Sequence, residues 1–129
     1  MLFRSEWHLS SGEDDFARTL YQNILSRDPE EGASHGWGDH IRFHGIASAI
    51  KGFIITYKEF HLMRLPHEDV VDKLYRSILG GESTDVEKTE QVVRLRNGDS
   101  TSIIINGLLG SEEYRHRVEL GAAPSPIRL

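Results

Sequence analysis

The chain has 129 residues, of which 38% are hydrophobic and 27% charged, and its formal net charge is −5. This composition is typical of a soluble globular protein, and the length predicts a single domain, residues 1–129, with a modest core. Lysine and arginine are scattered rather than gathered on a basic face, so no nucleic-acid partner is expected. No apolar run approaches the ~18 residues that a membrane span requires, and the absence of cysteine excludes disulfides and thiolate chemistry.

The first half of the chain begins with two predicted helices. Residues 13–26 carry apolar side chains at i, i+1, i+4, i+5, i+8 and i+9, a spacing typical of one broad helical face. Asp28 suits the N-cap of a second helix, and Pro29 suits its first position. We therefore expect this second helix over residues 29–44, with Gly45 as its C-terminal stop.

Two further helices are expected before the middle of the chain. The third covers residues 46–55. Thr56 and Glu59 have the spacing of a capping box, which predicts a short fourth helix that ends by Pro66.

The second half of the chain is similar to the first. An ungapped shift of 54 residues aligns residues 14–60 with residues 68–114. Nine identical pairs result, mainly at apolar helical spacings: Asp15/Asp69, Leu20/Leu74, Tyr21/Tyr75, Ile24/Ile78, Leu25/Leu79, Arg42/Arg96, Ser48/Ser102, Ile50/Ile104 and Glu59/Glu113. The helices expected by this alignment cover residues 68–79, 85–97, 100–109 and 112–120.

The predicted fold is therefore an all-α, duplicated helical bundle with two four-helix repeats of about 54 residues. Repeat one covers residues 14–66, repeat two covers residues 68–120, and residues 121–129 form a tail. The β-branched run Ile103–Ile105 favours a strand when it is considered alone. Its partner segment in the alignment, residues 48–55, has a helical composition, so we expect a helix here as well.

The stretch FARTLYQNILSRDPEEG (Phe16–Gly32), followed by Trp37, Ile41, Ala47, Phe53 and Glu59-Phe60, resembles the bacterial domain of unknown function 4214 family. LYRSILGG and SEEY in the second half are similar to the same pattern, and the resemblance covers roughly residues 14–118. The second half departs from the pattern at Ser83, Val86 and Gln91, where the family has proline, glycine and tryptophan. A more distant likeness is to the helical linker domains of phycobilisomes.

The resemblance implies a context rather than a reaction. Repeats of this family occur in secreted, S-layer-like and calcium-repeat proteins, and attached to glycosyltransferases. We therefore expect a non-catalytic binding or scaffolding module in a bacterial cell-surface glycan or secretion context, cytoplasmic or secreted as part of a larger protein. The alternatives are an accessory domain of a glycosyltransferase and a linker-like assembly subunit. The expected partner is another protein or a glycan.

The predicted binding residues are Arg27, Trp37, His40, Arg42 and His44. Aromatic faces together with charged hydrogen-bonding groups suit both sugar sites and protein hot spots. The alternative for Trp37 is that it fills the core, since large aromatic side chains dominate cores.

Neither a metal site nor a catalytic site is predicted. His40 and His44 share a helix face and could form one edge of a metal site, with His35 and Asp39 nearby, but a structural site usually needs four ligands and the spacing of the others is lacking. The acidic pairs occupy helix starts, where the helix dipole explains them. No nucleophile elbow or phosphate-binding loop occurs, so no cofactor is expected.

Overall fold

The computed structural model describes residues 12–56, 65–121 and 123–124. All regular elements in these segments are helical, so the predicted all-α fold class is confirmed. Within the same segments, no helix is both long and apolar enough to cross a membrane. The predicted fourth helix falls largely on residues 57–64, which lie outside the described residues.

The first half contains α1 (Glu13–Leu20), a π-helical turn η1 (Tyr21–Leu25), α2 (Ala33–His44) and α3 (Ile46–Thr56). Helix α1 packs against α2, and α2 packs against α3. The predicted helix over residues 13–26 is therefore present, but its last turn widens into a π-helix. It ends at Ser26, whose backbone is left-handed with φ 56°.

The start of the second helix was predicted wrongly. Asp28 does not cap it, and the helix begins at Ala33, four residues after the predicted start at residue 29. Gly32 precedes it in a left-handed conformation with φ 80°, which glycine adopts without steric cost. The Asp28 carboxylate instead accepts a hydrogen bond from the Gln22 amide at 3.2 Å. A turn at Gly32, rather than the local capping signals, therefore sets where α2 begins.

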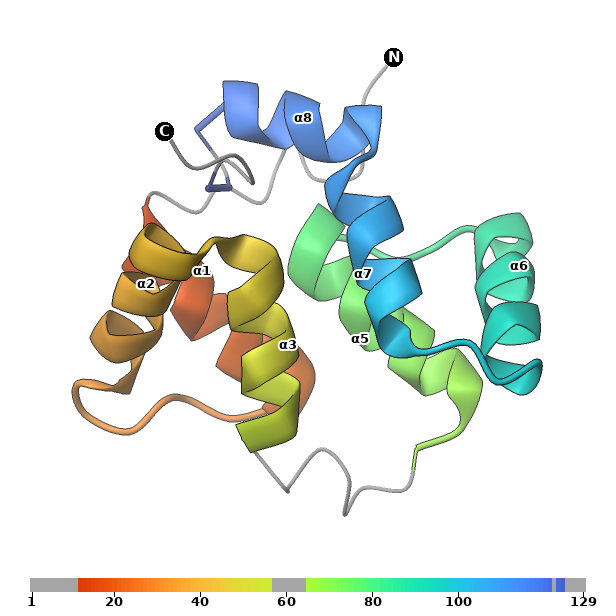
Figure 1. Cartoon of the computed structure of the whole chain (residues 1–129), viewed down its shortest axis with the longest axis horizontal. Coiled ribbons are helices and arrows are strands. Elements are labelled where there is room, and N and C mark those ends of the chain that lie inside the picture. Colours follow the sequence, from red (N-terminus) through yellow and green to blue (C-terminus); the bar gives the residue numbers. More distant parts are fainter. Residues whose placement is uncertain (1–11, 57–64, 122, 125–129) are drawn as a thin grey trace.

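The second half contains α5 (His67–Leu79), α6 (Asp85–Arg96), α7 (Thr101–Leu109) and α8 (Glu112–Glu119). Each helix matches its predicted range to within one residue at either end. Figure 1 shows α5, α6 and α7 beside the group formed by α1, α2 and α3, with α8 across one end of the molecule. The β-branched run Ile103–Ile105 lies inside helix α7, as the alignment of the two halves predicted.

One hydrophobic core joins the two halves, because η1 packs against α5 and α3 packs against α7. Two of the aligned pairs, Leu20/Leu74 and Ile24/Ile78, are buried in this core, with at most 1% of the surface of each residue exposed. After α8 the chain returns to the body, where Ala123 is buried and the Tyr114 hydroxyl donates a hydrogen bond to the Pro124 carbonyl at 2.6 Å. These two residues of the predicted tail therefore pack on the domain.

Candidate binding surface on helix α2

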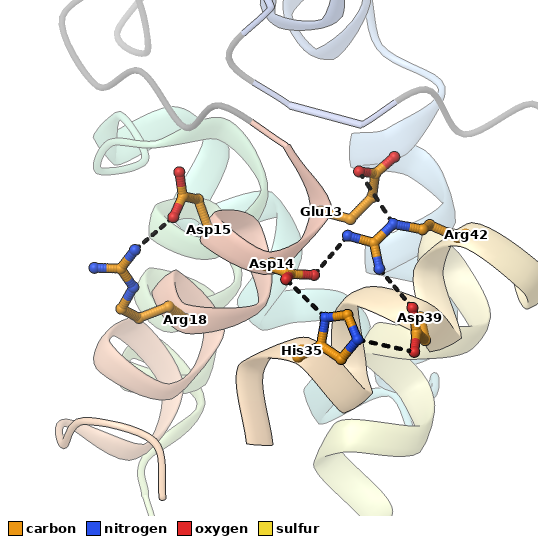
Figure 2. A network of polar contacts seen from close by, with 7 residues as sticks. All are labelled: Glu13, Asp14, Asp15, Arg18, His35, Asp39 and Arg42. Carbon is orange, nitrogen blue, oxygen red and sulfur yellow. Dashed lines mark hydrogen bonds and ion pairs between the residues drawn. The ribbon is translucent and has the colours of Figure 1, made fainter. Parts of the chain in front are cut away.

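Helix α2 carries all the predicted binding residues except Arg27, and its two sides have different chemistry. One side faces α1 through a network of ion pairs, shown in Figure 2. The Arg42 guanidinium donates to the carboxylates of Asp14 and Asp39, each at 2.6 Å, and its Nε lies 3.6 Å from Glu13. All three nitrogens of Arg42 are directed at carboxylates.

His35 belongs to the same network. Its Nδ1 lies 3.0 Å from Oδ2 of Asp14, and its Nε2 lies 3.5 Å from Oδ2 of Asp39. The hydrogen bond to Asp14, helped by the charge of Asp39, raises the pKa of His35. The same bond, followed by the one from Arg42, lowers the pKa of Asp14. Both carboxylates therefore favour the protonated form of the His35 imidazole over the neutral form.

This arrangement connects α1 to α2. The guanidinium of Arg42 is less available to a ligand than predicted, because it is already paired with carboxylates. The sequence carries a signal for the network that the prediction missed: His35, Asp39 and Arg42 are spaced i, i+4 and i+7, which places them along one helix face. Their partner, Asp14, lies on another helix and had no local signal.

The other side of α2 carries a row of rings. The centroids of Trp37 and His40 lie 5.4 Å apart, and those of His40 and His44 lie 4.9 Å apart. Phe43 is the i+3 neighbour of His40, and 62% of its surface is exposed. We call these four residues, Trp37, His40, Phe43 and His44, the α2 aromatic row.

Trp37 connects this row to the core. The indole is partly buried and packs edge-on against the buried Phe53 of α3, with 5.3 Å between ring centroids. Trp37 therefore combines the two predicted possibilities, since one part of the ring supports the core and another part is accessible.

The imidazole of His40 is held by neighbours on both helices. It shares a hydrogen bond of 3.2 Å with the Ser48 hydroxyl of α3. Burial, followed by the charge of His44, lowers the pKa of His40. The neutral ring is therefore favoured at neutral pH, and a neutral imidazole has one donor and one acceptor nitrogen.

Arg27 lies just after η1, two residues beyond its end, rather than in the row. Its guanidinium stands over the Tyr21 ring, 5.3 Å from the centroid, and pairs with Glu30 at 2.8 Å. Tyr21 in turn packs edge-on against Phe53, with 4.9 Å between centroids. Two buried rings therefore connect Arg27 to Trp37, and these two predicted site residues belong to one packing unit.

The histidines of α2 do not assemble a metal site within the described part of the chain, where no group of three or more potential ligands is close enough to hold an ion. His35 is engaged by Asp14 and Asp39, and His40 and His44 lie in the aromatic row.

Comparisons with protein-family models, with curated proteins and with solved structures found no match to this chain. The resemblance to the domain of unknown function 4214 family therefore stays a prediction that rests on the quoted residues.

Proposed function

We propose that this protein is a non-catalytic binding module built from two copies of one helical repeat, and that its partner binds the α2 aromatic row. The observation that carries the proposal is the exposed side chain of Phe43 on the same helix as the neighbouring rings of Trp37, His40 and His44. The resemblance to the domain of unknown function 4214 family supports a bacterial cell-surface or secretion context for this module.

Two ion pairs support the duplication. Arg42 and Asp14 are separated by 28 residues and pair at 2.6 Å between α2 and α1. Arg96 and Glu68 are separated by the same 28 residues and pair at 3.3 Å between α6 and α5. The shift that aligns the two halves superimposes one pair on the other, with a carboxylate at the start of the first helix in both.

The composition of the aromatic row suits a binding surface. Interfaces are enriched in aromatic side chains, and the energetically dominant contacts are large rings that are partly preorganised before binding. Trp37 is fixed by Phe53, and His40 is fixed by Ser48, so these two rings lose little freedom on association. Phe43 and His44 are exposed and can be covered by a partner.

The partner class that fits best is another protein, because an exposed phenyl ring gains most from being covered by an apolar surface. A glycan is the second candidate, because the neutral imidazole of His40 and the partly exposed indole of Trp37 offer the ring surface and the hydrogen-bonding groups that a sugar needs.

The experiment compares binding by the wild type and by the double variant Phe43→Ser/His44→Ala, with pull-down of proteins and a glycan array as parallel measurements. Both side chains are exposed, so the melting temperature is expected to stay within a few degrees of the wild type. Val86→Ser/Val93→Ser on α6 is the matched control, because it also removes two exposed apolar side chains.

The proposal requires that a partner retained by the wild type and by the α6 control is lost by the α2 variant. Retention of every partner by the α2 variant would show that the aromatic row is not the binding surface. Trp37→Ala is less informative alone, because loss of its contact with Phe53 lowers stability whether or not the indole binds a partner.

A further inference from the structure

Two neighbouring histidines lie within the α2 aromatic row. The imidazole rings of His40 and His44 are 4.9 Å apart between centroids, and the indole of Trp37 lies 5.4 Å from His40. His40 is partly buried, whereas His44 is exposed. Histidine is the side chain whose charge changes near neutral pH. A partner that covers the row therefore covers two groups that titrate in this range.

Helix α3 disfavours a positive charge on His40. It faces the ring with the Ser48 hydroxyl, which shares a hydrogen bond of 3.2 Å, and with Gly52, where an added Cβ atom would lie 3.9 Å from Cε1 of His40. Neither residue carries a charge. The ionisable residue of α3 is Lys51, so this helix has no carboxylate that could balance an imidazolium.

The carboxylates near the other side of α2 do not balance this charge either, because the ion-pair network of Figure 2 engages them. They are directed at Arg42 and His35, and they belong to Glu13, Asp14 and Asp39. Within the described part of the chain, burial and the charge of His44 are the two causes that lower the pKa of His40. The two imidazoles therefore repel each other when both are protonated.

We propose that His40 and His44 make binding at the α2 aromatic row sensitive to pH, so that the row holds an apolar protein surface when both rings are neutral and releases it in acid. This inference rests on the proposed function of the row. A surface that packs on the exposed side chain of Phe43 also removes water from the neighbouring imidazoles. An imidazolium covered in this way loses its hydration without gaining a carboxylate, whereas a neutral imidazole loses much less.

The direction of the pH dependence follows from this cost. Binding favours the neutral rings, so the affinity is highest at alkaline pH and falls as the pH drops through the pKa of the free imidazole. If only the neutral form binds, the apparent affinity is proportional to the neutral fraction, which is about one tenth at one pH unit below the pKa. His40 alone therefore predicts about a tenfold loss of affinity at that pH, and the charge of His44 adds to the loss.

The test measures the partition of the whole chain onto phenyl-agarose, a resin that presents neutral phenyl groups, at constant salt. The measurements are made at about pH 8 and about pH 5, the two ends of the range over which histidine titrates. The wild type is expected to bind at the alkaline end and to lose roughly tenfold or more of this binding at the acidic end. The double variant His40→Gln/His44→Gln keeps polar side chains without a titrating group and should bind alike at both ends.

Two further variants separate the pH sensitivity from the binding surface. Phe43→Ser keeps both histidines and removes the exposed ring, so it should bind weakly at both ends of the pH range. Val86→Ser/Val93→Ser removes two exposed apolar side chains from α6 and should keep both the binding and the pH dependence of the wild type. Circular dichroism at both pH values shows that each variant is folded.

A wild type that binds equally or more strongly at about pH 5 would overturn the proposal. An equal loss of binding in the wild type and in the double glutamine variant would overturn it too, because other groups would then cause the loss. If Phe43→Ser binds as the wild type does at the alkaline end, the row is not the binding surface, and the proposed function fails together with this inference. Weak binding by Phe43→Ser with a pH-independent wild type rejects only the pH sensitivity.

Discussion

Gly38 of α2 lies directly against Asp14 of α1. A Cβ atom on Gly38 would overlap Oδ1 of Asp14 and would lie only 3.1 Å from the Asp14 backbone nitrogen. Gly38 therefore allows the close approach of α1 and α2 at this point. At Gly36, two residues earlier on the same helix, an added Cβ atom would meet nothing within 4 Å.

We predict that alanine substitutions at these two glycines change stability in opposite directions. Gly36→Ala should stabilise the protein by up to ~1 kcal/mol, because alanine has the higher helix propensity and the site has space. Gly38→Ala should destabilise it by about 1–3 kcal/mol, because the methyl group forces α1 and α2 apart at Asp14. Urea denaturation of both variants measures the difference. Equal stability of the two variants would show that the contact at Asp14 adapts freely.

The second prediction concerns two histidines of α2. His35 should titrate above its ordinary pKa of about 6.5, because the carboxylate of Asp14 favours the imidazolium, and His40 should titrate below it, because burial disfavours the charge. Nuclear magnetic resonance titration of the ring protons measures both midpoints. Asp14→Asn should lower the midpoint of His35 without moving that of His40.

These two shifts have opposite consequences for stability. The raised pKa of His35 gives a contribution that is fully present below about pH 6.5 and is lost as the pH rises through the folded-state pKa. The lowered pKa of His40 gives a contribution that is present above about pH 6.5 and is lost as the pH falls toward its folded-state pKa. His35→Gln should therefore lower the stability more at acidic than at alkaline pH. His40→Gln should remove the part of the stability loss that the wild type shows as the pH falls below about 6.5.

The helices of the second half could be predicted closely because their signals are local. The side chain of Thr84 accepts a hydrogen bond from the Glu87 backbone at 3.2 Å, and its backbone nitrogen donates to the Glu87 carboxylate at 2.8 Å. This is a capping box, and its residue types and spacing can be read directly in the sequence. Glycines at the helix ends act in the same way, and Gly80 ends α5 with φ 77°.

The start of α2 could not be predicted by such rules, because two local signals compete there. Asp28 and Pro29 have the residue types of a helix start, yet the left-handed turn at Gly32 delays the helix to Ala33. The π-helical turn was also not foreseen, because its apolar spacing is that of an ordinary helix. Contacts between helices are harder still to predict. Arg42 and Asp14 are 28 residues apart and lie on different helices, so no local sequence pattern relates them.

The last prediction compares the two arginines that connect the first and second helices of each half. Arg42 contacts three carboxylates, and 35% of its side chain is exposed. Arg96 pairs with the carboxylate of Glu68 at 3.3 Å, and 64% of its side chain is exposed. We expect Arg96→Gln to change the stability by no more than about 0.5 kcal/mol, because exposed ion pairs contribute little.

Arg42→Gln should lower the melting temperature more than Arg96→Gln does, because it leaves Glu13, Asp14 and Asp39 close together with mainly His35 to offset their charge. Added salt should reduce this difference, since exposed charges are screened within about 10 Å at 0.1 M ionic strength. Lower pH should reduce it as well, as His35 becomes fully charged. Melting curves of both variants at low and high salt measure the effect, and a salt-independent difference would mean that Arg42 acts through packing rather than through its charge.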